Sequence, residues 1–102
     1  MDINLNYRNP ITNVRSLGDD TDKVIKHAES FVRGFQEDGL MAATAKHFPG
    51  DGTDERDHHL LTTYNHLSVG DWRNSYGRVW KSVIDVGVNS VMVGHIAFPA
   101  YE

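Results

Sequence analysis

Met41-Ala42-Ala43-Thr44-Ala45-Lys46 is a run of small and apolar residues that hardly alternates with polar ones. A second such run, Ser90-Val91-Met92-Val93-Gly94-His95-Ile96, lies near the end of the chain. Runs of this kind are typical of strands that are buried on both faces of a parallel sheet. A shorter third candidate, residues 2–5, lies near the start.

A helix is predicted before each of the two longer strand candidates. The first begins at Asp19 or Asp20, either of which can cap it, and Gly39 ends it. The second begins at Ser68, where the spacing resembles a capping box, and ends at Gly87. Apolar residues recur at helical spacing in both: Val24, Ile25, Ala28, Phe31, Val32 and Phe35, then Trp72, Tyr76, Val79, Trp80, Val83 and Ile84.

The predicted order is strand, helix, strand, helix, strand, which is the βαβαβ pattern of an α/β fold. Polar residues follow the strands, at the end of a parallel barrel that carries the chemistry. A complete eight-stranded barrel needs roughly 250 residues, and this chain has 102. We therefore predict an incomplete, parallel βαβαβ segment of a TIM (β/α)8-type barrel. It forms one partial domain over residues 1–102, with roughly three strands, two helices and no second domain.

Composition narrows the classes of function. The net charge is -4 and the sequence shows no basic stripe, which argues against nucleic-acid binding. No apolar run approaches the roughly 20 residues that a membrane-spanning helix needs. The chain has no cysteine, so disulfides and thiolate metal sites are excluded. We predict no cofactor. The compartment stays open, with the cytoplasm favoured.

The densest polar stretch directly follows the first long strand candidate. It reads Lys46-His47-Phe48-Pro49-Gly50-Asp51-Gly52-Thr53-Asp54-Glu55-Arg56-Asp57-His58-His59. The proline and glycines allow tight backbone turns. The lysine and histidine end a buried strand, where polar side chains cost free energy unless they make specific contacts. This position favours a functional loop over a merely solvated one.

This stretch resembles the signature of family-3 glycoside hydrolases, most closely their β-N-acetylglucosaminidase branch. The resemblance is carried by residues 46–50, Gly52 and the Asp57-x-His59 pair, and it extends to residues 9–18 and 91–99. It implies a fragment of a retaining glycosidase that hydrolyses β-linked N-acetylhexosamine glycosides through a covalent glycosyl-enzyme. The implied partner is a carbohydrate containing N-acetylglucosamine.

The resemblance also assigns roles to residues. In the family, a Lys-His pair and a loop arginine bind the sugar, which implies Lys46, His47 and Arg15 as substrate-binding residues. An Asp-His dyad on a mobile loop serves as the general acid/base, which implies His59 as the catalytic group and Asp57 as its catalytic partner. An imidazole suits this chemistry because its proton exchanges near neutral pH, and a neighbouring carboxylate fixes its tautomer.

The sequence departs from the family pattern at two positions. Asp51 stands where many members carry histidine, and His58 stands where many carry serine. Two adjacent histidines leave open whether His58 or His59 is the acid/base, and the spacing from Asp57 favours His59.

Other functions remain open from the sequence alone. The near alternatives within the family are a β-glucosidase-type enzyme and a glycosyl phosphorylase. The phosphorylase is conceivable because a histidine acid/base bears no fixed negative charge that would repel phosphate. A metal-binding module is a second, with ligands drawn from Asp54, Asp57, His58 and His59, although the spacing matches no strong metal motif. A third is a fragment without catalysis that forms homo-oligomers through exposed sheet edges.

The resemblance places the nucleophilic aspartate on a later strand, beyond Glu102. Because retaining hydrolysis requires a nucleophile and an acid/base on opposite sides of the anomeric carbon, we predict that the isolated chain has no appreciable hydrolase activity. Incubating the purified chain with para-nitrophenyl β-N-acetylglucosaminide should release no nitrophenolate above background. Ordinary turnover by the chain would refute the prediction.

Overall fold

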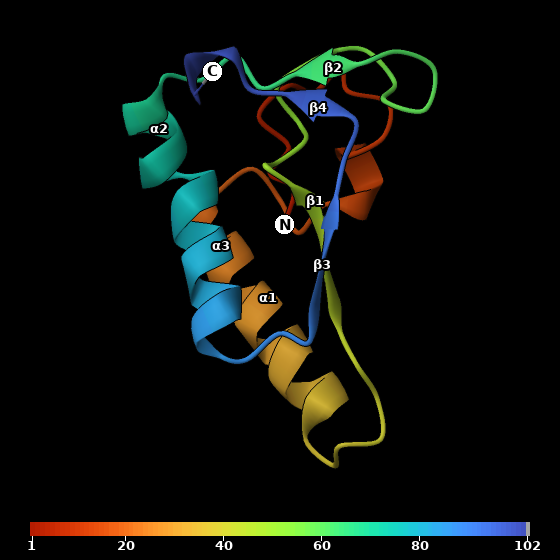
Figure 1. Ribbon diagram of the computed structural model, residues 1–102, viewed down its shortest axis with the longest axis vertical. Coiled ribbons are helices and arrows are strands. Elements are labelled where there is room, and N and C mark those ends of the chain that lie inside the picture. The colour runs from red at the N-terminus through yellow and green to blue at the C-terminus, as the bar shows by residue number, and fades with distance from the viewer. Residues whose placement is uncertain (102) are drawn as a thin grey trace.

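The computed structural model describes residues 1–101 and is drawn in Figure 1. The α-helices are α1 (Thr21–Gln36), α2 (Val69–Asn74) and α3 (Tyr76–Asp85), and the short 3-10 helices are η1 (Asn13–Arg15) and η2 (Pro99–Tyr101). The strands are β1 (Thr44–Phe48), β2 (Thr63–Tyr64), β3 (Ser90–Val93) and β4 (Ile96–Ala97). Within residues 1–101 no helix has the length and apolar character needed to cross a membrane.

The strands form two parallel pairs. β1 pairs with β3, so that Thr44 lies opposite Ser90, and β2 pairs with β4, so that Thr63 lies opposite Ile96. The segment between β1 and β3 contains α2 and α3, which makes it the helical crossover that parallel strands require. The predicted parallel arrangement of the two longer strands is confirmed.

The register of the β1–β3 pair shifts at His47. Lys46 lies opposite Met92 and Phe48 lies opposite Val93, so one residue of β1 has no partner in β3. A bulge of this kind interrupts the alternation of side chains along a strand, and bulges are common beside active sites. Consecutive residues of β1, Lys46 and His47, consequently line the same cavity. The Lys46–His47 and Phe48–Pro49 peptide bonds are cis.

Both predicted helix starts are confirmed by their caps. The side chain of Asp20 accepts a hydrogen bond from the backbone N–H of Lys23 at 2.9 Å. The Ser68 hydroxyl accepts from the backbone N–H of Asp71 at 3.1 Å and donates to its carboxylate at 2.7 Å. Each contact satisfies a group that the first helical turn would leave without a partner.

The single helix predicted after Ser68 is instead two helices, divided at Ser75. The indole N–H groups of Trp72 and Trp80 both donate to the Pro49 carbonyl oxygen, at 2.8 and 3.1 Å. In one straight helix, eight residues would separate the two side chains by about 12 Å along the axis. The division at Ser75 lets both indoles reach the same acceptor.

The predicted strand at residues 90–96 is also divided. It ends at Val93, and Gly94 and His95 separate it from β4, which joins the second sheet. The strand predicted at 41–46 lies two to three residues later, at β1. β2 was not predicted, because two residues carry no periodicity.

The prediction of a strand at residues 2–5 is wrong. The segment has no strand partner and lies along the turn that follows β1, where the backbone N–H of Ile3 donates to the Asp51 carbonyl and that of Asn6 donates to the Gly52 carbonyl. The apolar side chain of Ile3 is fully buried, but it is buried in the core between the helices and not as part of a β-sheet. A short apolar run indicates that a segment is buried, but it does not show whether the segment is a strand or an unpaired extended segment.

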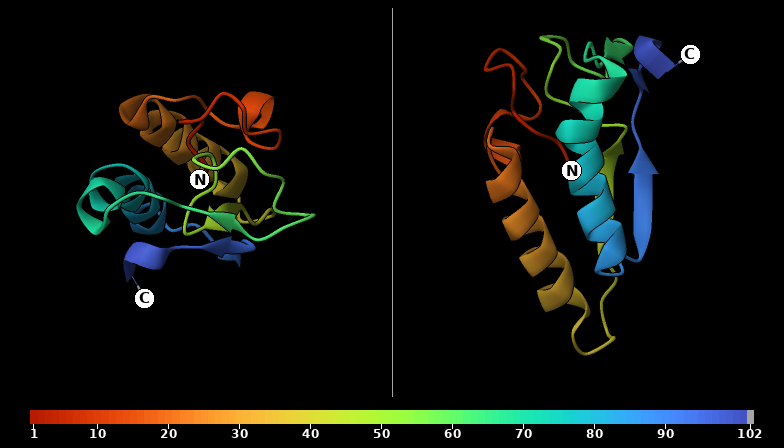
Figure 2. Two further views of the ribbon diagram at one scale, coloured as in Figure 1. Left: turned by 90° about the horizontal axis from the view of Figure 1, so that it is seen from above. Right: turned by 90° about the vertical axis from the view of Figure 1, so that its left-hand side faces the viewer.

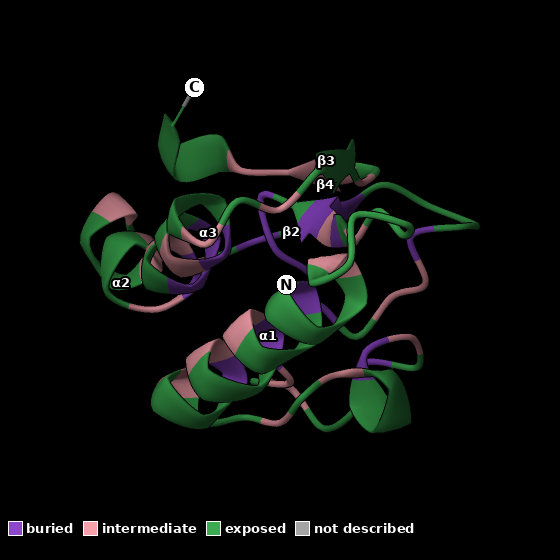
Figure 3. Cartoon of the chain, turned by 90° about the horizontal axis from the view of Figure 1, so that it is seen from below, coloured by how far each residue is buried: buried purple, intermediate pink, exposed green. Residues whose placement is uncertain are grey.

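The core lies between the two long helices and one face of the β1–β3 pair. α1 and α3 lie side by side and cover the same side of the strands (Figure 2). Buried residues gather where these helices face each other and the strands, whereas their outer turns are exposed (Figure 3). The core residues are Ile3, Val24, Ala28, Val32, Ala45, Tyr76, Val79, Trp80 and Val83. The side chains of β3 are exposed, including Val93 at 70%.

Tyr76 joins the N-terminal segment to the turn after β1. Its buried hydroxyl lies 2.9 Å from both the Ile3 and the Asp51 carbonyl oxygens, so its single proton is shared between two acceptors. Gly52 adopts a φ of +119°, and a Cβ atom there would lie 1.9 Å from the Ile3 carbonyl oxygen. Only glycine allows the two backbones to approach this closely.

Gly52→Ala should therefore lower the free energy of unfolding by roughly 3 kcal/mol or more, because it adds backbone strain to a collision with a main-chain atom. Gly87→Ala is the matched control, since Gly87 also has a positive φ (+83°) but has open space around it. Its effect should be about 1–2 kcal/mol. Urea denaturation followed by circular dichroism measures both, and equal losses would contradict the close approach.

Candidate functional site

A cavity of about 440 Å³ lies between η1, α1 and β1. Arg15, at the end of η1, lines it together with Lys46 and His47 from β1. Apolar side chains from α1, such as Phe31, form much of the remaining wall. All three residues predicted to bind substrate therefore border one cavity.

Asp2 fixes the orientation of His47. Its carboxylate lies 2.8 Å from the His47 ring Nδ1 and accepts from the backbone N–H groups of His47 and Asp51, at 2.9 and 3.0 Å. Burial alone would raise the pKa of Asp2, but the bonds from the His47 ring and the two backbone N–H groups lower it below its ordinary value. The ionised carboxylate holds the proton of His47 on Nδ1, which leaves Nε2 for another contact.

Asp57 and His59 form the predicted pair. The Asp57 carboxylate lies 2.7 Å from the His59 ring Nδ1 and accepts from the His59 backbone N–H at 2.8 Å. These two bonds lower the pKa of Asp57 below its ordinary value. The His59 side chain is 59% exposed, so its remaining nitrogen is open to a ligand.

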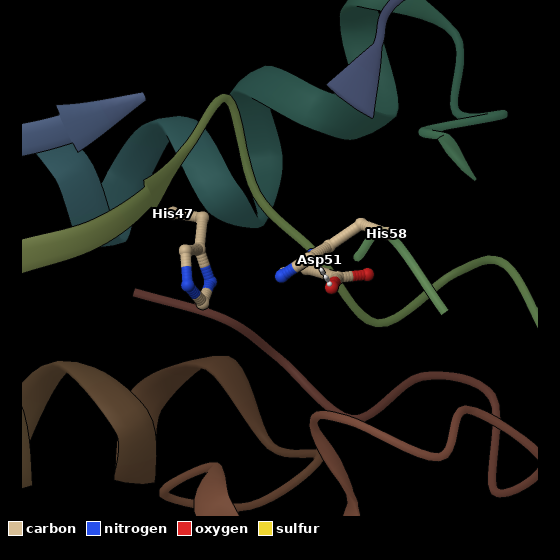
Figure 4. A group of neighbouring side chains, drawn as sticks. All are labelled: His47, Asp51 and His58. Atoms are coloured by element: carbon tan, nitrogen blue, oxygen red, sulfur yellow. Dashed lines mark ion pairs between the residues drawn. The ribbon is translucent and has the colours of Figure 1, made fainter. Parts of the chain in front are cut away.

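His58 lies between this pair and His47. It is buried, and its ring centroid is 4.6 Å from that of His47 and 4.4 Å from that of His59. Its Nδ1 lies 2.7 Å from the buried carboxylate of Asp51. Figure 4 shows that Asp51 and His58 come from the loop after β1, and His47 from the strand itself. Three imidazoles thus form a continuous row from the cavity wall to the exposed pair.

Asp54 anchors the loop that carries the pair. Its buried carboxylate accepts from the Tyr64 backbone N–H at 2.8 Å and from the backbone and side chain of Arg56. The Arg56 guanidinium holds the pKa of Asp54 well below its usual range. The adjacent Asn9 amide donates to the Asp54 carbonyl and to the Asp51 carboxylate, at 2.8 and 3.0 Å.

The structure does not gather the four metal ligands considered from the sequence. The Asp54 carboxylate is bonded to the Arg56 side chain, and the Asp57 carboxylate is bonded to the His59 ring. Within residues 1–101, the group of possible ligands that converges is His47, Asp51 and His58.

Sequence reasoning missed two of the residues that build the site, Asp2 and Asn9. Asp2 stands 45 residues before its histidine, and Asn9 stands 42 residues before the carboxylate it contacts. No local pattern marks such contacts. Asp2 does adjoin the buried Ile3 in the sequence, but its neighbour does not identify its partner.

The chain matches the N-terminal domain of glycosyl hydrolase family 3 over residues 1–102. It belongs to glycosyl hydrolase family 3. A beta-N-acetylglucosaminidase/beta-glucosidase from Cellulomonas fimi is 54% identical to it over 102 residues, which are 100% of this chain and 18% of that protein. A beta-hexosaminidase from Vibrio cholerae is 36% identical over 92 residues, covering 86% of this chain and 26% of that protein.

Solved family-3 structures superpose closely on the chain. A beta-N-acetylglucosaminidase from Paenibacillus sp. gives a TM-score of 0.94 at 38% identity and covers 99% of this chain. The beta-glucoside phosphorylase BglX gives 0.93 at 43% identity and covers 97%. The chain spans 19% and 18% of those two proteins. The predicted α/β fold, a segment of a TIM-type barrel, is confirmed.

The anchoring role of Asp54 gives a pH-dependent prediction. A carboxyl group whose pKa is lower in the folded state stabilises the fold above its unfolded pKa of about 4, and this contribution is lost as pH falls. Asp54→Asn should reduce the free energy of unfolding by about 2 kcal/mol at pH 7, with a smaller difference below pH 4. Urea denaturation across this range measures it. A constant difference at every pH would contradict it.

Proposed function

We propose that this chain supplies the sugar-binding residues and the general acid/base of a retaining β-N-acetylglucosaminidase. The observation that supports the proposal best is the Asp57–His59 pair, joined at 2.7 Å and connected through the His58 ring to a cavity bordered by His47. The family signature and the similarity to proteins named beta-N-acetylglucosaminidase and beta-hexosaminidase agree with it.

In this proposal the residues that contact the sugar are Arg15, Lys46 and His47. The two cations donate hydrogen bonds to hydroxyl and carbonyl oxygens of a bound saccharide. His47 adds a nitrogen whose direction is fixed by Asp2. A group held in place before the sugar arrives loses little conformational freedom on binding, which favours affinity.

The proton transfers fall on His59. With its Nδ1 held by the ionised Asp57, the Nε2 nitrogen gives a proton to the leaving oxygen and later removes one from the attacking water. Asp57 orients the ring through its bonds to the ring Nδ1 and the backbone N–H of His59. The nucleophile that forms the covalent intermediate comes from a later part of the barrel.

A glycosyl phosphorylase is the second candidate. The solved beta-glucoside phosphorylase is 43% identical to this chain. A neutral imidazole at the acid/base position does not repel a phosphate dianion as a carboxylate would, so phosphate could replace water as the acceptor.

A chimaeric enzyme tests the proposal. Residues 1–102 replace the matching segment of the Cellulomonas fimi relative, with which they share 54% identity. The chimaera should cleave para-nitrophenyl β-N-acetylglucosaminide. His59→Gln should lower kcat about 100- to 10,000-fold, because proton donation to the leaving group is lost. The loss should be smaller with a dinitrophenyl leaving group, which departs without a proton.

His66→Gln is the matched control. His66 is an exposed histidine that stacks on Tyr64 and lies outside the proposed machinery, so its replacement should leave kcat unchanged. A folded chimaera without activity, or equal losses in the two histidine variants, would contradict the proposal. Formation of sugar 1-phosphate when inorganic phosphate is added would favour the phosphorylase instead of the hydrolase.

A further inference from the structure

Three buried side chains converge beside the cavity, and the proposed function gives a role to only one of them, His47. His47, Asp51 and His58 each offer one ligand atom, and these atoms all lie within 4.8 Å of one another. Their exposed fractions are 6%, 2% and 5%. We propose that this trio binds a divalent transition-metal ion of the zinc type. The inference does not depend on the glycosidase proposal.

The polar atoms at the centre of the trio lack ordinary partners. His58 Nδ1 and Asp51 Oδ2 face each other at 2.7 Å as a buried ion pair, and neither atom has a hydrogen-bond partner. Buried polar atoms are nearly always hydrogen-bonded, and an exception calls for an explanation such as an ion. A cation that both atoms coordinate satisfies them together.

The surrounding contacts already orient the ligands as in established metal centres. Metal-binding histidines usually give their second ring N–H to a carboxylate, and Asp2 accepts this bond from His47 Nδ1 at 2.8 Å. The other oxygen of Asp51 accepts from the Asn9 amide at 3.0 Å and the Gly52 backbone N–H at 2.7 Å. His47 Nε2 and Asp51 Oδ2 are therefore the atoms that these outer contacts leave available as ligands.

Two imidazoles and one carboxylate select the metal class. This set suits zinc and other late divalent metals, whereas magnesium and calcium prefer oxygen ligands alone. Tetrahedral ligands at 2.0–2.2 Å from zinc lie about 3.4 Å apart, so each side chain of the trio needs to move by less than about 1 Å. A water molecule takes the fourth position.

Metal binding here has a consequence for the site beside it. His47 cannot give Nε2 to a metal and to a sugar at the same time. Given the proposed function, zinc at the trio would therefore compete with the saccharide.

Zinc titration of the purified, chelator-treated chain tests the inference by isothermal calorimetry. One equivalent of zinc should bind at micromolar concentrations, and magnesium should not. Asp51→Asn keeps an amide oxygen for the bonds from Asn9 and Gly52 but removes the coordinating oxygen. It should weaken zinc binding by more than the roughly 10- to 100-fold typical of losing an outer-shell partner.

Asp57→Asn is the matched control, because it alters the neighbouring Asp-His pair and leaves the trio intact. Its zinc affinity should equal that of the unsubstituted chain. Loss of zinc binding in this control but not in Asp51→Asn would overturn the proposal, as would no zinc binding by the folded chain. Should Asp51→Asn fail to fold, X-ray absorption of zinc on the unsubstituted chain decides: scattering from two imidazoles supports the trio, and its absence overturns it.

Discussion

The carboxylate of Asp2 is the contact on which the rest of the site depends. It holds three donors at once: the His47 ring, the His47 backbone and the Asp51 backbone. These bonds attach the N-terminal segment to the end of β1 and to the turn that follows. A half-buried carboxylate with this many donors stays ionised, and removing one donor would leave its charge less well compensated. The position of the turn, and hence of the loop beyond it, follows from this contact.

The loop couples two regions that differ in burial. On one side, His47 is fixed by Asp2 at the wall of a cavity; on the other, the exposed His59 is bonded to Asp57. The buried His58 lies between them and touches both rings. An arrangement of this kind keeps the proposed binding residues rigid and leaves the proposed acid/base accessible, which suits a group that must approach a bound ligand.

What the sequence predicted well was local. The caps at Asp20 and Ser68 depend on residues three positions apart, and the two longer parallel strands were indicated by composition over a few residues. The expected burial of both faces is wrong for β3, whose side chains are exposed. The division of the second helix was not predictable, because its apolar stripe continues across Ser75 and the cause is a shared acceptor far away in the chain. The pairing of Asp57 with His59 was implied by the family resemblance, whereas no pattern in the sequence distinguishes the buried His58 from its neighbour.

The long sequence separations of the site contacts have a consequence for how the molecule assembles. The bond between Asp2 and His47 closes a loop of 45 residues, and that between Ile3 and Tyr76 closes one of 73. Closing such loops loses chain entropy before any contact forms, so these bonds become favourable only once the helices and strands have already collapsed together. The orientation of His47 therefore depends on contacts between parts of the chain that lie far apart in the sequence.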